Sequence, residues 1–271
     1  VTYDRHIELD IKTKEPFDRI WAFHHREAPL LTVPDSLSDG ICCPALDNDE
    51  MTLIPLSRPV EQIRLCASVA DSSFAHSAFY GFSLENGRSG VLYHSFGING
   101  NTYAAINRNP QIVRQASGLC PDLVIVSLGT NDSYGASFDP ADADVQITRL
   151  IDSIRRNMPA SVLLLTTPME HCRRIRSKGR TYRKPNPNAC AMRECILRQA
   201  ALYRLPVWDF YAAAGGDGAM GRWADLGIAN ADRVHLSREG YRLQGKLFYD
   251  AIMKAYDHYR KHNGELKILL N

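Results

Sequence analysis

Apolar and polar positions alternate with a short period along the first third of the chain. Turn-forming clusters at 34–40 and 85–90 separate short segments rich in β-branched and aromatic residues. No segment there shows an apolar stripe at helical spacing. Residues 1–89 are therefore predicted to form a β-sandwich or jelly-roll domain. The expected strands cover 6–12, 19–25, 29–33, 51–56, 62–69, 78–84 and 91–97.

From about residue 90 onward, near-continuous apolar runs alternate with amphipathic segments. The runs at 91–97, 122–129, 161–168 and 205–210 are typical of parallel strands that are buried on both faces. Strand and helix in alternation predict an α/β domain over 90–271, with a doubly wound parallel sheet in three layers. Such a sheet binds its ligand at the carboxyl ends of the strands.

Three helices are predicted between these strands and after them. One begins at Asp139 with a proline in its first turn, the second begins near Asn188, and the third begins at Ser237. Each has one apolar stripe, which we expect to be buried. The stripes are Ile147, Leu150, Ile151, Ile154 and Met158; Met192, Cys195, Ile196 and Leu202; and Phe248, Ala251, Ile252 and Ala255.

Composition and charge exclude several classes of function. The net charge of +2, from 32 basic and 30 acidic residues, gives no overall field that favours nucleic acid or an anionic membrane. No apolar run approaches the roughly 18 residues of a membrane span. The start Val-Thr-Tyr-Asp is neither an initiator methionine nor a signal peptide, so we expect a processed product or a fragment. The 7 cysteines contain no C-x-x-C pair, which predicts free thiols and no zinc site.

Polar motifs follow the predicted strands. They read GINGNTY at 97–103, GTNDSYG at 129–135, TTPMEH at 166–171 and, after a glycine-rich loop, DRVH at 232–235. Because the carboxyl ends of parallel strands meet at one edge of a sheet, we expect these motifs to form a common polar rim.

Four residues of this rim have side chains or backbone groups suited to acyl transfer. A separation of three brings Asp232 and His235 to the same side of a turn, where the carboxylate can hold one imidazole nitrogen and leave the other for a serine. Asn131 offers an amide donor and Gly100 an unobstructed backbone N–H, and two such donors make an oxyanion hole. The alternatives are a capping Asp232 with a packed His235, an Asx turn at Asn131 and a tight turn at Gly100.

The motifs GINGNTY, SLGTNDSYG and DRVHLSREGY resemble the second, third and fifth sequence blocks of the SGNH or GDSL-type serine hydrolases. The resemblance covers about 90–271, and 1–89 is similar to the β-domain that some Bacteroidetes-type members insert. It implies a flavodoxin-like fold and a bacterial, periplasmic or secreted esterase. The implied substrates are small acyl esters, such as O-acetyl groups of carbohydrate or peptidoglycan, and no metal or organic cofactor is implied. The implied catalytic residues are Asp232, His235, Asn131 and Gly100.

The first block of that family, a Gly-Asp-Ser with the nucleophile, has no clear copy. The nearest text is Asp35-Ser36, where Pro34 replaces the glycine. A nucleophile strand feeds a helix, whereas 41–51 contains Pro44 and turn residues, so we expect 34–40 to be a loop between strands. The nucleophile serine is expected from a preceding or separate polypeptide segment. Either residues outside this chain complete the sheet, or a segment of the β-rich half replaces the missing strand.

The segment 173–184 is strongly basic and almost free of acidic residues. We interpret it as a solvated loop that overhangs the rim, where it could attract an anionic glycan or contact a partner.

Two other functions remain as alternatives to an esterase. One is a non-catalytic carbohydrate-binding or scaffold protein of the same fold, because no nucleophile is evident. The other is a nucleotide-binding domain that uses GINGNT as a phosphate loop. The second is disfavoured, because the spacing is not G-x-G-x-x-G and no Gly-Lys-Ser/Thr is present.

Overall fold

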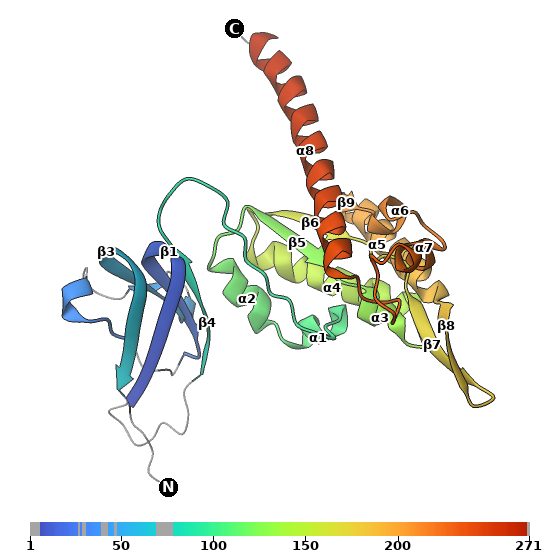
Figure 1. Ribbon diagram of the computed structural model, residues 1–271. Coiled ribbons are helices and arrows are strands. Elements are labelled where there is room, and N and C mark those ends of the chain that lie inside the picture. The colour runs from blue at the N-terminus through green and yellow to red at the C-terminus, as the bar shows by residue number, and fades with distance from the viewer. Residues whose placement is uncertain are drawn as a thin grey trace. The chain divides into compact units, whose positions relative to one another are not determined.

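The computed structural model describes residues 6–26, 28, 31–38, 43–45, 48–68 and 78–269 (Figure 1). The chain divides into two compact units. Unit 1 comprises Val1–Phe96 and Arg114–Leu119, and unit 2 comprises Gly97–Val113 and Cys120–Asn271. The sequence placed the boundary between 89 and 90, and it gave no sign that a short segment after residue 113 returns to the first unit.

Unit 1 is built on a four-stranded antiparallel sheet in the order β2-β3-β1-β4. Its strands are β1 (His6–His24), β2 (Cys43–Ala45), β3 (Asn48–Ser68) and β4 (Phe79–Glu85). β1 and β3 pair along most of their length, and most of the buried apolar residues described in this unit form one cluster. The cluster contains Phe17, Ile20, Ala22, Leu31, Leu37, Ile54, Leu56, Val60, Ile63, Leu65 and Ala67.

Four of the expected short strands are in fact two long ones. Residues 6–12 and 19–25 fall in or beside β1, and 51–56 and 62–69 in or beside β3. Pro16 and Pro59 each lie between two of the expected short strands. The pairing of β1 with β3 instead shifts register between Lys12 and Arg19, so the chain continues through a bulge that tolerates proline.

The predicted sandwich is not confirmed, because the described residues of unit 1 form a single sheet. Pro29 and Leu30 of the expected strand 29–33 lie outside the described residues. Of the rest, Leu31 is buried, and Thr32 makes only an isolated antiparallel bridge to Cys66. Residues Asp35–Leu37 form the short 3-10 helix η1.

The expected strand 91–97 is wrong. This segment is irregular, and its apolar side chains are open to solvent, with Val91 94% and Tyr93 82% exposed. A strand forms only where a neighbour satisfies its backbone donors and acceptors, and no described segment pairs with this one.

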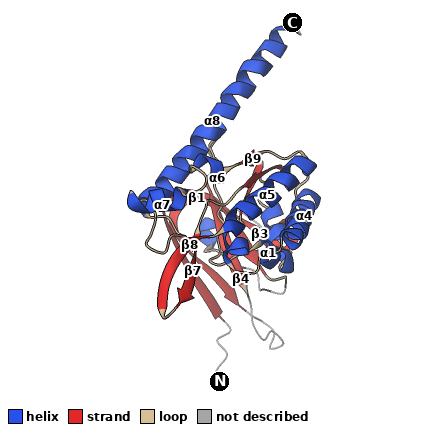
Figure 2. Cartoon of the chain, turned by 90° about the vertical axis from the view of Figure 1, so that its right-hand side faces the viewer, coloured by secondary structure: helices blue, strands red, loops and turns tan. Residues whose placement is uncertain are grey.

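Unit 2 contains a parallel sheet in the order β5-β6-β9, which confirms the α/β class. Its strands are β5 (Leu123–Ser127), β6 (Val162–Thr166) and β9 (Val207–Trp208). The helices are α1 (Tyr103–Arg108), α3 (Thr130–Tyr134), α4 (Pro140–Asn157), α5 (Pro187–Tyr203), α6 (Phe210–Ala213), α7 (Ala219–Asp225) and α8 (Arg238–Leu269) (Figure 2). Helix α2 (Gln111–Ser117) spans the division between the units. The described strands do not establish the doubly wound, three-layer arrangement.

The helix starts at Asp139 and near Asn188 are confirmed, and each has a side-chain cap. Asp139 accepts a hydrogen bond from the N–H of Ala141, and Asn186 accepts one from that of Asn188. The buried stripes are as expected except for Leu202, which is 72% exposed. It lies on the same helical face as Cys195 but in the last turn of α5, so the apolar stripe is longer than the packed part of the helix.

Helix α8 follows Ser237, as predicted, but its stripe is only partly covered. Phe248, Ala251 and Ile252 are half-buried, and Ala255 is exposed, contrary to expectation. Both views show the C-terminal half of α8 extending away from the rest of unit 2 (Figures 1 and 2).

The basic segment 173–184 is a hairpin of β7 (Cys172–Ser177) and β8 (Arg180–Pro185), not a loop. Its turn residues Lys178 and Gly179 have φ of +48° and +73°. Two successive positive φ angles match the twist of antiparallel strands, which explains the tight turn. The sequence pattern did not indicate strand β8, because five of the six residues in RTYRKP are polar or proline.

A cluster of buried polar groups closes the base of this hairpin. His171 Nε2 lies 3.0 Å from Ser133 Oγ, which itself donates to the carbonyl of Gly129 at 2.7 Å. The Asn186 side chain donates to the carbonyl of Ser133 at 2.8 Å, and its backbone N–H donates to that of His171 at 2.9 Å. The short helix α3, which carries Asn131, is therefore attached to both ends of the hairpin.

The start of α8 packs closely against the segment before the DRVH motif. The N–H of Ser237 donates to the carbonyl of Ile228 at 3.1 Å, and Ala229 forms an isolated bridge with Leu236. Gly240 is buried here, and a Cβ at this position would overlap the carbonyl oxygen of Ile228. The glycine is thus required by a close approach of two backbones.

Replacing Gly240 by alanine should lower the free energy of unfolding by about 1–3 kcal/mol, because the helix start must shift away from Ile228. Gly245 is the matched control, since it lies in the same helix with open space around its Cα. Gly245→Ala should raise stability by about 0.5–1 kcal/mol through helix propensity. Urea unfolding of both variants measures the difference, and equal effects of the two substitutions would contradict the close approach.

Candidate functional site

The DRVH motif lies in a tight turn between α7 and α8. The N–H of Asn230 donates to the carbonyl of His235 at 2.8 Å, and the N–H of Arg233 donates to that of Asn230 at 2.9 Å. Arg233 has a φ of +52°, in the left-handed region that non-glycine residues rarely adopt. Such backbone strain persists only where the surrounding contacts fix it.

Asp232 and His235 are hydrogen-bonded through their side chains. The Oδ2 of Asp232 lies 2.7 Å from the Nδ1 of His235, and its Oδ1 accepts the N–H groups of Val234 and His235, each at 3.0 Å. Burial raises the pKa of Asp232, but the hydrogen bonds from His235 and the two backbone N–H groups outweigh this, and the pKa is lowered. The carboxylate is thus held charged and in a fixed orientation.

The other nitrogen of His235 remains accessible. The side chain is 66% exposed, and its Nε2 makes no hydrogen bond with the described residues. With Nδ1–H donating to the carboxylate, the lone pair of Nε2 can accept a proton. A carboxylate that holds one imidazole nitrogen in this way leaves the other nitrogen available for proton transfer.

Asn131 and the turn at Gly100 lie together. The Asn131 Nδ2 donates to the carbonyl of Asn101 at 2.9 Å, and Gly100 has a φ of +75° in a turn closed by Asn101 N–H and Ile98 O. The next residue, Asp132, accepts the N–H of Tyr103 at 2.9 Å. Burial raises the pKa of Asp132 even though this N–H donates to it.

The base of the β7–β8 hairpin contacts both the DRVH turn, which carries Asp232 and His235, and the helix that carries Asn131. On one side, Cys172 N–H donates to the carbonyl of Arg233 at 2.8 Å, and Arg183 Nε donates to that of Ala231 at 2.7 Å. On the other side, His171 contacts Ser133, two residues after Asn131. Within the described residues, no hydrogen bond or ion pair joins Asn131 or Gly100 directly to His235.

Ser36, which the sequence disfavours as the nucleophile, belongs to unit 1, and the four predicted site residues belong to unit 2. It lies in η1, after Pro34, and its backbone carbonyl accepts a hydrogen bond from Ser57 Oγ. No described serine side chain is hydrogen-bonded to His235.

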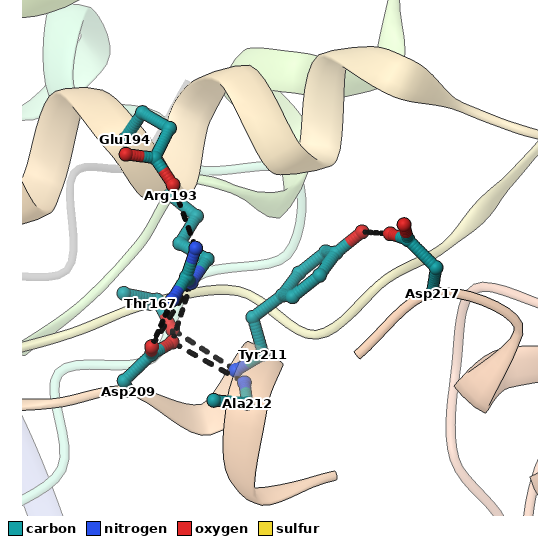
Figure 3. Close-up of polar contacts among 7 residues, drawn as sticks. All are labelled: Thr167, Arg193, Glu194, Asp209, Tyr211, Ala212 and Asp217. Carbon is teal, nitrogen blue, oxygen red and sulfur yellow. Dashed lines mark hydrogen bonds and ion pairs between the residues drawn. The ribbon is translucent and has the colours of Figure 1, made fainter. Parts of the chain in front are cut away.

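Some polar residues at the strand ends form a separate network that the sequence did not reveal (Figure 3). Asp209, after β9, accepts hydrogen bonds from Thr167, after β6, and from Arg193 of α5. Burial raises the pKa of Asp209, but these hydrogen bonds outweigh it and lower the pKa. The network ties two strand ends to a helix, so Thr167 is part of the scaffold around the site. The sequence feature that could have indicated this network is Asp209, an aspartate directly after the apolar residues of β9.

Glu170 and His171 have positioning roles that the sequence also left unassigned. The carboxylate of Glu170 accepts the N–H groups of Gly218 and Met220 at the start of α7. Burial lowers the pKa of His171 to about 4. Its Nδ1 is buried and has no partner among the described residues, so protonation would leave an unpaired charge in the interior.

No group of His, Cys, Asp and Glu side chains within the described residues is arranged to hold a metal ion. Of the cysteines that the structure describes with their side chains, Cys66, Cys172, Cys190 and Cys195 are free thiols. Among the described helices, none is long and apolar enough to span a membrane.

The solved structures that this chain is similar to include two esterases and a GDSL-like lipase. A peptidoglycan O-acetylesterase matches 92% of this chain with a TM-score of 0.61 at 19% identity, and the chain spans 65% of that protein's length. An acetyl xylan esterase matches 58% of this chain and 78% of its own, at 18% identity and a TM-score of 0.45. A GDSL-like lipase from Bacteroides thetaiotaomicron matches 58% of this chain and 73% of its own, at 20% identity and a TM-score of 0.42. No curated protein is significantly similar.

The family comparison covers most of the candidate site. Residues 70–243 match the GDSL-like Lipase/Acylhydrolase family, a span that includes Gly100, Asn131 and the DRVH turn. This span is more than half of the 271 residues. The chain therefore belongs to the GDSL-like lipase/acylhydrolase family.

Proposed function

We propose that this protein is a serine-type carboxylic ester hydrolase that acts on small acyl esters. The observation that carries the proposal is the 2.7 Å hydrogen bond between Asp232 and His235, which leaves Nε2 of the imidazole exposed and uncommitted. Membership of the GDSL-like lipase/acylhydrolase family supports hydrolysis of an ester. The Asp232–His235 pair also supports it, because such a pair is the part of an acyl-transfer site that activates the nucleophile.

In the proposed mechanism, a serine Oγ attacks the ester carbonyl carbon while His235 Nε2 takes its proton. His235 then gives that proton to the leaving alcohol, and Asp232 stabilises the imidazolium. Water, deprotonated in the same way, hydrolyses the acyl-enzyme and regenerates the serine.

In this proposal, Asn131 and Gly100 donate the hydrogen bonds that stabilise the oxyanion of the tetrahedral intermediate. One hydrogen of the Asn131 amide is donated to Asn101, which fixes the plane of the amide, and the second hydrogen is left for the substrate. Gly100 has no side chain to cover its own backbone N–H. Two donors fixed before the reaction stabilise the developing negative charge without a cost of reorientation.

The nucleophile, in this proposal, is a serine on a preceding or separate polypeptide segment. Supporting this, β5 pairs with β6 on one side, and no described strand pairs on its other side. The apolar sequence of β5 is typical of a parallel strand that is buried on both faces of a sheet, yet Leu123 is 41% exposed. A parallel strand placed along this edge would deliver a residue to the same rim as Asn131.

The proposed substrate is a small acyl group, such as acetyl, on a carbohydrate or on peptidoglycan. Both His235 and Asn131 are exposed, so the candidate site is open enough for an ester attached to a polymer. The peptidoglycan O-acetylesterase with a similar fold is consistent with this class of substrate. A periplasmic or secreted location belongs to the same proposal.

A second candidate is a non-catalytic protein of the same fold that binds carbohydrate or serves as a scaffold. The observation that favours it is that no described serine side chain contacts His235. The two candidates differ in whether an activated serine is present.

A fluorophosphonate probe, which labels only an activated serine, separates these possibilities. Residues 1–271 alone should remain unlabelled, and the chain together with the serine-bearing segment should be labelled on that segment. Mass spectrometry locates the adduct. Labelling of Ser36 in the isolated chain would contradict the proposed source of the nucleophile, and absence of labelling in both samples would favour the non-catalytic protein.

His235→Ala in the complete enzyme should reduce hydrolysis of p-nitrophenyl acetate by about 10⁴-fold or more, because the serine loses its base. Its thermal unfolding should be little changed, since the side chain is mostly exposed. His94→Ala, at an exposed histidine of unit 1, is the control and should keep full activity. Retention of most activity by His235→Ala would remove the assignment of the general base.

Asn131→Ala should lower kcat by about 10²–10³ with little change in KM, because an oxyanion donor acts mainly in the transition state. Steady-state kinetics on the same ester measure both constants. Asn157→Ala, at the exposed end of α4, serves as the control. A raised KM with an unchanged kcat would show instead that Asn131 binds the substrate in its ground state.

A further inference from the structure

The β7–β8 hairpin concentrates positive charge beside the candidate site. None of the ion pairs formed by the described residues involves these cations, and the hairpin itself contains no acidic residue. All but one of them are exposed. The cations are Arg173, Arg174, Arg176, Lys178, Arg180, Arg183 and Lys184.

The register of the hairpin places like charges opposite each other. Arg173 pairs with Lys184, and Arg174 pairs with Arg183. Like charges directly opposite on neighbouring strands destabilise a hairpin. A bound anion between the two members of a pair would remove this repulsion, so the hairpin is better suited to an anionic ligand than to solvent alone.

One face of the hairpin begins at the candidate catalytic turn. Because side chains alternate along a strand, Arg174, Arg176 and Arg183 share a face. At its base, Arg183 Nε donates to the carbonyl of Ala231, the residue before Asp232. The three arginines therefore run outward from the turn that holds His235, and both views show the hairpin projecting beyond the helices of unit 2 (Figures 1 and 2).

The opposite face adds an aromatic ring. Tyr182 lies opposite Ile175 and is 48% exposed, and it shares its face with Arg180 and Lys184. A tyrosine ring is a flat, rigid surface with a polar end, suited to contact with the C–H face of a sugar ring. The guanidinium groups match the geometry of carboxylates, which they bind with two parallel hydrogen bonds.

We propose that the β7–β8 hairpin binds a carboxylate-bearing polysaccharide and holds it so that its acyl ester reaches His235. This inference rests on the proposed ester hydrolase and specifies its substrate as an anionic glycan. The hairpin supplies binding along the polymer, and the turn at 232–235 supplies the chemistry. The hairpin base, fixed by His171 and Asn186, sets the path of the polymer relative to Asn131.

The experiment measures binding to residues 1–271 and needs no turnover. Isothermal titration calorimetry with polygalacturonate, a carboxylate polymer, should show binding that weakens strongly between about 50 mM and 500 mM salt, because screening shortens the range of the interaction. Neutral dextran of similar length should bind at least about tenfold more weakly. A failure of hydrolysis would leave this result untouched, so the two proposals fail separately.

The decisive variant is Arg174→Gln, Arg176→Gln and Arg180→Gln together, at exposed residues outside the contacts of the hairpin base. It should lose about tenfold in affinity for polygalacturonate, with circular dichroism unchanged. The matched control makes the same change of charge on α8, with Arg242→Gln, Lys254→Gln and Lys261→Gln, and should remain within about twofold. The single substitution Arg176→Gln should also lower the affinity for polygalacturonate, but by a smaller factor than the triple substitution.

Several results would overturn the proposal. Equal losses in the hairpin variant and the α8 control would show that only net charge matters. Equal affinity for dextran and polygalacturonate would remove the role of the carboxylates, and absence of binding to either would remove the site. Tighter binding of a single-stranded oligonucleotide than of polygalacturonate would assign the hairpin to nucleic acid instead.

Discussion

The buried contact between His171 and Ser133 determines the arrangement of unit 2 around the candidate site. The Ser133 hydroxyl donates to Gly129, so the neutral imidazole donates from Nε2 and keeps a bare Nδ1. Burial holds the pKa of His171 at about 4, which keeps the ring uncharged at neutral pH. This one contact thus joins helix α3, which carries Asn131, to the hairpin that reaches the DRVH turn.

Features that depend on neighbours in the sequence were predictable. The starts of α4 and α5 are set by capping residues followed by proline, and both signals are local. The hydrogen bond that His235 Nδ1 donates to Asp232 spans only three residues, so the spacing alone was enough to expect it. The α/β class followed in the same way from the apolar runs of β5 and β6.

Features that depend on distant partners were not predictable. Residues 91–97 have a strand-like composition, but a strand needs a neighbour, and the sequence does not say whether one is present. The opposite error occurred at 173–184, where charged side chains concealed a hairpin that its turn geometry stabilises. Two buried or half-buried networks join residues that lie 16 to 42 positions apart, and a periodic sequence pattern does not reveal such pairs. They are His171 with Ser133, and Asp209 with Thr167 and Arg193.

One edge of β5 is paired with no described strand, and this has a consequence for handling the protein. An edge that presents unsatisfied N–H and C=O groups beside apolar side chains is a template for pairing with another chain. Two copies of residues 1–271 that meet there would form an intermolecular ladder, which competes with any strand that belongs at that position. Concentrated samples should therefore self-associate through β5, and a peptide strand that fits the edge would act as a solubilising partner as well as a structural one.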